Sequence, residues 1–282
     1  MSKSRTERRL LLTIAAGVQT ISLFCVTLAA VVMVQFGVES IPINIVNETS
    51  YYEAQSETLK ERITELTLKC GLPESIVDGV FDSDEIMTFT KEYTANRIHG
   101  FEDTLETAPV MERLRANLYY YMDDQGMDMG ILDMDALNNY LSQAASLYMQ
   151  TVNNGFISSY QTLRTAFVRP AVGVILVGLV MTAVCMVFMY KLTGMRRKML
   201  SYTIRGTLSC AILCGVLAAW RFIFHGQTGV VYSPEYMEVL CRTFEDFFFK
   251  QFAVGMIVWL GISALCGGMI MRIKYHKKEK IR

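Results

Sequence analysis

The sequence predicts an all-α integral membrane protein, with four transmembrane helices and a helical extracytoplasmic domain inserted between spans 1 and 2. Hydrophobic residues make up 52% of the 282 positions, which favours a membrane protein. The charges are also segregated, because residues 39–165 hold 21 acidic and 8 basic residues, a net charge of −13. Fourteen basic residues flank the apolar runs instead, as Lys3/Arg5/Arg8/Arg9, Lys191/Arg196/Arg197/Lys198 and Arg272/Lys274/Lys277/Lys278/Lys280/Arg282. The positive-inside rule produces this pattern, since basic segments stay in the cytoplasm.

The first span is predicted at residues 10–38, which contain no charged residue. A helix needs about 20 residues to cross the hydrocarbon core of a bilayer. The basic tail 1–9 also fits a signal peptide, but the apolar run is about twice the usual length and no A-x-A cleavage site ends it. We therefore interpret it as an uncleaved anchor.

The other spans are predicted at residues 170–190, 201–224 and 251–271. Pro170 suits the start of the second span, because a proline is tolerated at the first helical position. The third span is the weakest, and we expect Arg205 and Arg221 to extend their charged groups to opposite interfaces. Four spans place the N-terminal tail, the linker 191–200 and the basic tail 272–282 in the cytoplasm. The predicted location is the plasma membrane, with residues 39–169 and 225–250 outside.

Residues 39–169 are predicted to form the extracytoplasmic helical domain. Residues 39–50 contain Pro42 and no periodicity, so we interpret them as a connector. Ser50 and Glu53 match a capping box, and an apolar stripe follows with helical spacing. Gly71 is expected to end this helix. Further helices are expected to begin near Pro73, Asp82, Pro109 and Asp133, with a break at residues 153–155 before the chain runs into span 2.

The outer loop 225–250 is predicted to contain an amphipathic helix that begins near Ser233-Pro234. One face of this helix holds Met237, Leu240, Phe244 and Phe248, a candidate docking face for a partner. The helix either lies at the membrane surface or extends span 4, or it docks against the acidic domain.

Two of the seven cysteines, Cys70 and Cys241, are predicted to face outward, and the other five fall in spans. A bridge between Cys70 and Cys241 would connect the two outer segments. It requires a Cα separation below about 7 Å, which the sequence does not show.

No motif for catalysis, cofactor binding or metal binding is present in the sequence. The acidic loop 123–130 fails the EF-hand pattern, since neither Gly126 nor Gly130 follows acids at the required positions. The three histidines have no neighbouring nucleophile or ligand in the sequence, and the predicted spans contain no acidic residue. We therefore predict a protein that is not an enzyme, with no catalytic residue, cofactor or metal.

Three stretches resemble a group of uncharacterised four-pass membrane proteins of Gram-positive bacteria with a helical extracytoplasmic domain. They are Tyr51-Tyr52-Glu53, the turn Gly71-Leu72-Pro73-Glu74-Ser75-Ile76-Val77, and the run Met111-Glu112-Arg113-Leu114-Arg115-Ala116-Asn117-Leu118. The resemblance implies the four-span layout and no function. In span layout alone, the chain is also similar to the permease of the cell-division ABC transporter, although the strands of that outer domain are not found here.

The expected function is that of a non-enzymatic cell-envelope membrane protein. Its outer helical domain would bind a partner or relay a state to another membrane protein, because the cytoplasmic segments are too short for an output domain. The alternative is a permease-like or accessory subunit of a transport complex, and a surface hydrolase is a third hypothesis. Beside the lipid bilayer, the expected partner is a membrane protein or a second copy of the chain, and not a nucleic acid.

Overall fold

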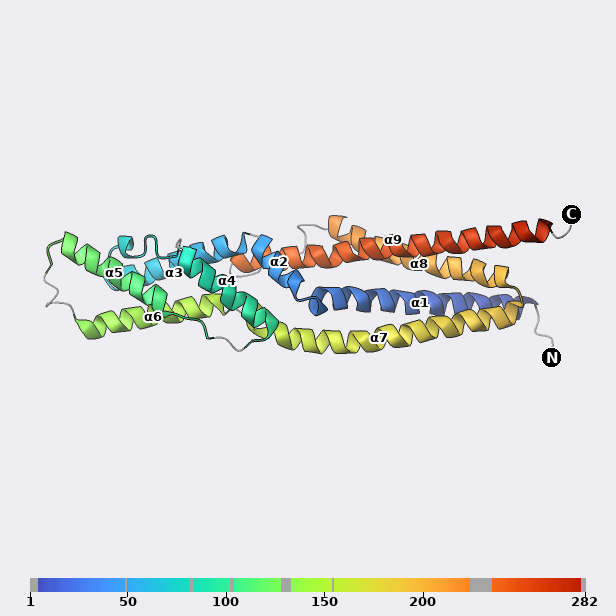
Figure 1. Ribbon diagram of the computed structural model, residues 1–282, viewed down its shortest axis with the longest axis horizontal. Helices are drawn as coiled ribbons and strands as arrows, with labels where there is room; N and C mark the ends of the chain where they lie inside the picture. Colours follow the sequence, from blue (N-terminus) through green and yellow to red (C-terminus); the bar gives the residue numbers. More distant parts are fainter. Residues whose placement is uncertain are drawn as a thin grey trace. The chain divides into compact units, whose positions relative to one another are not determined.

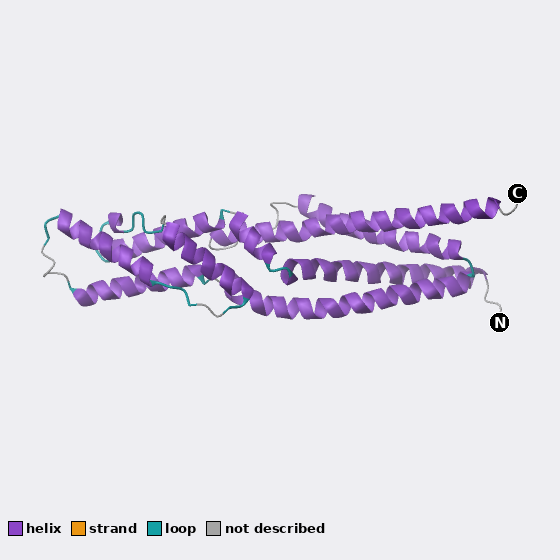
Figure 2. Cartoon of the chain, viewed as in Figure 1, coloured by secondary structure: helices purple, strands orange, loops and turns teal. Residues whose placement is uncertain are grey.

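The computed structural model describes residues 5–48, 50–81, 84–101, 104–127, 133–153, 155–223 and 235–279. Within these ranges every regular element is a helix and no strand occurs, as Figure 2 shows. The all-helical fold expected from the sequence is therefore confirmed. The chain separates into two compact units, one of residues 1–38, 165–230 and 245–282, and one of residues 39–164 and 231–244. We call them the span unit and the polar unit.

Four helices among the described residues are long and apolar enough to cross a membrane: α1 (Arg5–Gly37), α7 (Gly155–Thr193), α8 (Arg196–Ile223) and α9 (Glu235–Glu279). Their apolar windows have mean hydropathies between 1.5 and 2.7. They match the four predicted spans, although α1 and α8 end one residue before the predicted ends and α7 and α9 are much longer than predicted. Their first residues belong to the polar unit.

Pro170 lies inside α7 and not at its start, so this part of the prediction is wrong. A proline inside a helix removes one backbone hydrogen bond and is disfavoured in water. Proline is nevertheless tolerated in spans, because neighbouring helices, Ser or Thr side chains and small local adjustments of the helix can satisfy the backbone groups that it frees.

In the span unit, α1 packs against α7 and α8 near one end and against α8 and α9 further along (Figure 1). The first contact joins Leu12 and Ala15 to Cys185 and Met189, with Tyr202 at its edge. The second contact is built from the buried residues Leu23, Val31, Cys210, Cys214, Ala218 and Phe252. Because lipid is as apolar as these side chains, close packing and interhelical hydrogen bonds hold such a bundle together.

Polar contacts between these helices include two that join α9 to side-chain hydroxyls of α1 and α8. Trp259 Nε1 donates to Thr27 Oγ1 at 2.8 Å, and the hydroxyls of Thr207 and Ser263 lie 2.7 Å apart. Glycines permit a close approach of these helices at some positions and not at others. A Cβ at Gly215 would lie 2.9 Å from Met256 Sδ, whereas one at Gly267 or Gly268 would meet nothing within 4 Å.

The polar unit contains α2 (Ser40–Glu48), α3 (Tyr51–Lys69), a 3-10 turn η1 (Glu74–Ile76), α4 (Asp84–His99), α5 (Ala108–Asp124) and α6 (Met134–Val152). The helix α2 replaces the predicted connector. Pro42 falls in its first turn, where a missing N–H leaves no intrahelical bond unmade. Ile45 and Val46 are buried, which gives this short helix an apolar face.

The predicted helix boundaries are only partly confirmed. Gly71 ends α3 with φ +74°, and the Leu72 N–H bonds the Thr67 carbonyl, which is the pattern of a Schellman motif. Pro109 lies in the first turn of α5, as predicted. In contrast, Ser50 makes no side-chain cap bond, so the predicted capping box does not form.

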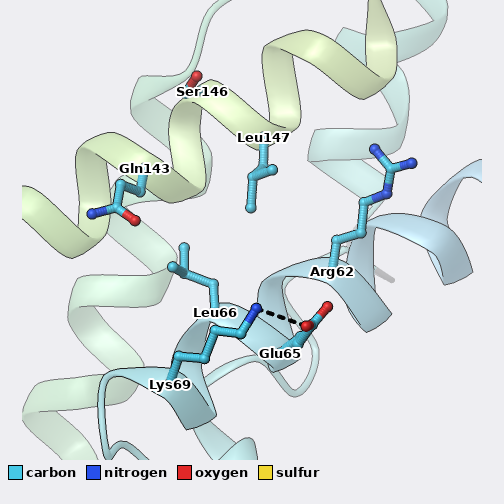
Figure 3. A pocket seen from close by; sticks show the side chains of 7 residues that line it. All are labelled: Arg62, Glu65, Leu66, Lys69, Gln143, Ser146 and Leu147. Carbon is cyan, nitrogen blue, oxygen red and sulfur yellow. Dashed lines mark hydrogen bonds and ion pairs between the residues drawn. The ribbon is translucent and has the colours of Figure 1, made fainter.

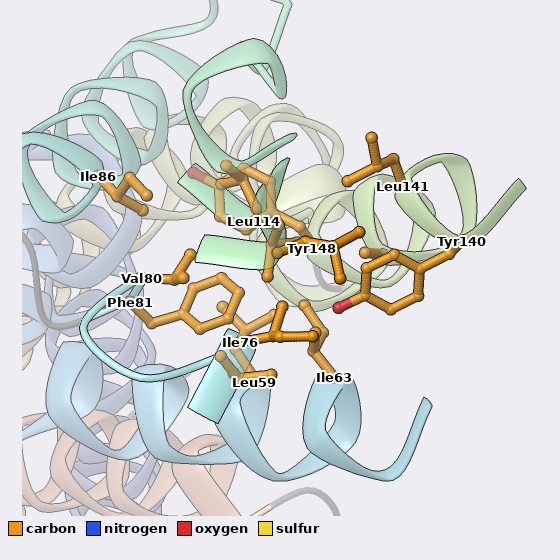
Figure 4. Packing of buried hydrophobic residues seen from close by; sticks show 14 of the residues in the cluster. Leu59, Ile63, Ile76, Val80, Phe81, Ile86, Leu114, Tyr140, Leu141 and Tyr148 are labelled. Carbon is orange, nitrogen blue, oxygen red and sulfur yellow. The ribbon is translucent and has the colours of Figure 1, made fainter. Parts of the chain in front are cut away.

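One hydrophobic core fills the polar unit, and the predicted apolar stripes of α3, α5 and α6 meet in it (Figure 4). Ile63 and Leu114 are fully buried, and Tyr148 is 1% exposed. The buried hydroxyls are paired, with Thr67 2.9 Å from Tyr140 and Thr90 2.9 Å from Tyr148. Burial raises the pKa of both tyrosines. Their hydroxyls are therefore neutral structural groups at physiological pH.

Candidate functional site

The first residues of α9 are held in the polar unit by a buried polar cluster. The Tyr236 hydroxyl donates to the Thr151 carbonyl at 3.1 Å, and Gln55 Nε2 donates to the same oxygen at 3.1 Å. Gln55 Nε2 also donates to Tyr51 Oη at 3.2 Å. The rings of Tyr51 and Tyr236 pack edge to face with centroids 5.7 Å apart. We call Tyr51, Gln55, Thr151 and Tyr236 the Tyr236 cluster.

The Tyr236 cluster is buried, so its hydrogen bonds are costly to break. All four residues are at most 2% exposed. A buried polar group that loses its hydrogen bond costs about 1–3 kcal/mol. The cluster therefore fixes the beginning of α9 against α3 and α6.

The first part of α7 is held in the same unit by a second group of contacts. Glu39 accepts from Arg164 of α7 through Oε1 and from His99 Nδ1, the last residue of α4, at 2.9 Å through Oε2. A carboxylate only accepts hydrogen bonds, so the Nδ1 of His99 carries the proton. Gln161 Nε2 donates to the Ile98 carbonyl. These contacts, which we call the Glu39 cluster, join α7 to the end of α4.

The Glu39 carboxyl is electrostatically stabilised as an anion. The hydrogen bond from His99 and then the one from Arg164 hold its pKa below the ordinary value of 4.5. Its side chain is 37% exposed, so water screens the interaction. The Glu39 cluster is therefore a partly solvent-exposed set of ion pairs and not a buried one.

The surface of the polar unit carries a groove between α3 and α6 (Figure 3). Its cavity of about 420 Å³ is lined by Arg62, Glu65, Leu66, Lys69, Gln143, Ser146 and Leu147. Leu66 and Leu147 point toward each other across its floor. Lys69 lies 2.7 Å from Glu65, and this hydrogen bond lowers the pKa of the Glu65 carboxyl.

The chemistry of this α3–α6 groove suits binding. Its lining combines a short apolar floor with two cations, one carboxylate, an amide and a hydroxyl. A mixture of this kind can orient a polar peptide segment or side chain. The seven lining residues include no histidine that could act as a base for a Ser146 nucleophile, and no cysteine that could itself be a nucleophile.

The predicted docking face on α9 is divided between the two units. Leu240 is fully buried and Met237 half-buried in the polar unit, whereas Phe248 packs on Phe252 in the span unit with ring centroids 5.4 Å apart. Phe244 is half-buried. The helix thus both extends span 4 and contributes residues 235–244 to the polar unit, which combines the two predicted alternatives.

Cys70 and Cys241 are not joined by a disulfide in the structure. Cys70 follows the last residue of α3, about 28 Å along the helix from Tyr51 at 1.5 Å per residue. Cys241 lies one and a half turns after Tyr236, which contacts Tyr51. Such a separation does not favour the predicted bridge within one chain.

The acidic loop is only partly described, since residues 128–132 lie outside the described ranges. Asp133 caps α6, because its carboxylate accepts from the N–H groups of Asp135 and Ala136. Throughout the part of the chain that the structure describes, no three His, Cys, Asp or Glu residues gather as metal ligands.

Sequence reasoning missed the ion pairs of Arg221. This residue was expected to reach the membrane interface, but its side chain is 10% exposed and contacts two acids of α9. Its Nε donates to Asp246 Oδ1 at 2.7 Å, and Nη1 lies 3.4 Å from Glu245. The sequence could have indicated this pairing through one pattern, since a lone arginine ends the third apolar run and two acidic residues precede the fourth.

Comparison with known proteins finds no matching family model, no matching curated protein and no matching solved structure.

Proposed function

We propose that this chain is a non-enzymatic cell-envelope membrane protein, whose polar unit lies outside the membrane, binds a partner and relays its state to the spans. The observation that carries the proposal is the course of α7 and α9. Each helix begins among residues of the polar unit and continues as a candidate span. A change in the polar unit can therefore act directly on two of the four spans.

The attachment of these helices supports a relay. The Tyr236 cluster holds the start of α9 against α3 and α6 through two hydrogen bonds to one carbonyl. The Glu39 cluster holds the start of α7 to the end of α4. A rearrangement of α3, α4 or α6 would thus change the contacts that position α7 and α9. Transmission of this kind needs an element with two discrete arrangements.

The α3–α6 groove is the proposed partner site. It is formed by α3 and α6, the two helices that also supply Gln55 and Thr151 to the Tyr236 cluster. Binding there would act on the helices that hold α9. The net charge of −13 over residues 39–165 favours a partner whose surface is basic around the contact, whereas the groove itself, with two cations and one carboxylate, favours an acidic or polar group inside it.

The sidedness can be tested with the natural thiol of Cys70, which is exposed in the polar unit. A membrane-impermeant maleimide should label the wild-type chain in intact cells and should not label the double variant Cys70→Ser/Cys241→Ser, which removes both thiols of the polar unit. In this double-variant background, Arg197→Cys should react only after the membrane is permeabilised. Labelling of Arg197→Cys in intact cells, with Cys70 protected, would reverse the proposed orientation.

Partner binding can be tested by placing a photo-crosslinking amino acid at Gln143, an exposed residue of the groove. Met149 is the matched control, since it is exposed on the same helix but does not line the groove. We expect a discrete adduct from Gln143 and none from Met149. A second probe at Lys69, which also lines the groove, guards against a poor position at Gln143. Equal adducts from Gln143 and Met149, or no adduct from either Gln143 or Lys69, would contradict a partner site in the groove.

The relay itself can be measured on the purified adduct by hydrogen exchange. Binding with a relay should change the protection of α7 and α9 beyond residues 164 and 244, where the span unit begins. Tyr236→Phe should weaken this effect in α9 and leave the adduct intact. Changes confined to α3 and α6 would show binding without a relay.

A further inference from the structure

A second cavity lies in the span unit, where α1 begins, α7 ends and α8 begins. It has a volume of about 460 Å³, within the usual range of about 300–1,000 Å³ for ligand sites. Three helices contribute to its wall: Arg8, Arg9 and Leu12 from α1, Leu192 and Thr193 from α7, and Lys198, Ser201 and Tyr202 from α8. We call this cavity the basic pocket.

The basic pocket is strongly positive. Arg8, Arg9 and Lys198 line it, and no acidic residue does. Within the described ranges, no carboxylate forms an ion pair with any of these three cations. The Arg205 guanidinium adds a further cation, since it lies 5.0 Å from the ring centroid of Tyr202. An anion would therefore find several charged donors in one place.

The wall also supplies neutral donors and an apolar floor. Ser201 and Tyr202 carry hydroxyls that can donate to an anionic oxygen. The hydroxyl of Thr193, in contrast, already donates to the Met189 carbonyl at 2.8 Å. Leu12 is 5% exposed and packs in the contact between α1, α7 and α8. The apolar surface continues along α8, where Leu208 and Ile212 lie seven and eleven residues after Ser201 on the same helix face and are 38% and 65% exposed.

The position of the basic pocket is that of a membrane boundary. The candidate spans of α1, α7 and α8 begin or end at Thr6, Thr193 and Arg196, all within a few residues of the lining cations. Basic pockets between spans at the cytoplasmic face bind anionic lipid headgroups. A soluble anion would use the charges alone, whereas a lipid would also cover the exposed apolar side chains of α8.

We infer that the basic pocket binds the phosphate group of an anionic phospholipid, whose acyl chains lie along the apolar surface of α8. Arg8, Arg9 and Lys198 supply the charge, and the hydroxyls of Ser201 and Tyr202 orient the phosphate oxygens. The inference rests on the four candidate spans and is independent of what the polar unit binds. It gives the basic clusters a specific ligand, beyond their role in setting orientation.

The test uses the full-length chain in neutral detergent, titrated with a fluorescent phosphatidylglycerol or phosphatidylcholine. Phosphatidylglycerol should bind at least tenfold more tightly than phosphatidylcholine. Lys198→Gln should weaken phosphatidylglycerol about fivefold, since one basic residue near a membrane surface contributes about 1 kcal/mol. Arg8→Gln should act alike, which covers the case in which one variant fails to fold.

Arg197→Gln is the matched control, because it removes the same charge from the neighbouring residue, which does not line the basic pocket. We expect its affinity to stay within twofold of wild type. Equal weakening by Arg197→Gln and Lys198→Gln would show a diffuse charge effect and overturn the inference. Displacement of the lipid by 10 mM inorganic phosphate would assign the pocket to a soluble phosphate and overturn the lipid identity.

Discussion

The packing of α9 in the span unit makes a sharp prediction for two of its glycines. A Cβ added at Gly255 would lie 2.9 Å from Thr27 Cγ2, closer than real Cβ atoms approach a carbon. Thr27 cannot rotate away freely, because its hydroxyl donates to the Leu23 carbonyl at 2.9 Å and accepts from Trp259 at 2.8 Å. A Cβ at Gly261, in contrast, would meet nothing within 4 Å.

The magnitude follows from comparing alanine at the two positions. Replacing glycine inside a helix by alanine stabilises it by about 0.5–1 kcal/mol in both cases. At Gly255 the new methyl group also overpacks the contact, which costs about 1–3 kcal/mol. Gly261→Ala should therefore be slightly stabilising and Gly255→Ala destabilising. The difference between the two variants, about 1–3 kcal/mol, measures the overpacking alone because the helix propensity cancels.

The assay is thermal unfolding of the full-length chain in detergent, followed by circular dichroism. For a chain of this size, 1 kcal/mol corresponds to about 2–4 °C in Tm. Thr27→Ser removes Cγ2 and keeps the hydroxyl that Trp259 needs, so the double variant with Gly255→Ala should recover most of the loss. Equal Tm values for the two glycine variants, or no recovery in the double variant, would refute the proposed packing.

Three other substitutions test the charge pairs and the core. Asp246→Asn should cost about 1–3 kcal/mol, less than for a fully buried pair, because Arg221 is 10% but Asp246 33% exposed; an unchanged Tm would contradict this. Glu39 has a lowered pKa, so its contribution to stability is present above pH 4.5 and is lost below it. The denaturant midpoint of Glu39→Gln should therefore depend less on pH between pH 5 and 3 than that of the wild type. If the midpoints of both proteins fall equally over this range, the pairing of Glu39 does not contribute to stability. Ile63→Ala should cost about 2–5 kcal/mol, whereas Leu68→Ala, 51% exposed on the same helix, should stay within about 0.5 kcal/mol.

These predictions bear on function through the helices that they perturb. Asp246 and Gly255 position α9 against α8 and α1, and α9 begins in the polar unit. Variants that loosen these contacts while partner capture at Gln143 persists would separate the relay from binding. Variants in the core of the polar unit should impair both.

The sequence by itself determined the helical class and the four candidate spans. Long uncharged runs have no stable arrangement in a membrane other than helices with internal hydrogen bonds. It also determined local features, such as the end of α3 at Gly71 and the apolar stripes of α5 and α6. These depend on neighbours within one or two turns, so the pattern of residue types is sufficient to predict them.

Only the tertiary structure decided how distant residues are paired. Arg221 looked like an interfacial cation until Asp246 was placed beside it, and residues 40–48 became helical α2 with Val46 buried. Gly255 and Gly261 look alike in the sequence, yet only Gly255 faces Thr27, a residue more than 200 positions away. The basic pocket likewise needs three helix ends to meet. Such contacts depend on which face each helix presents to the others, and periodicity within one helix does not contain that information.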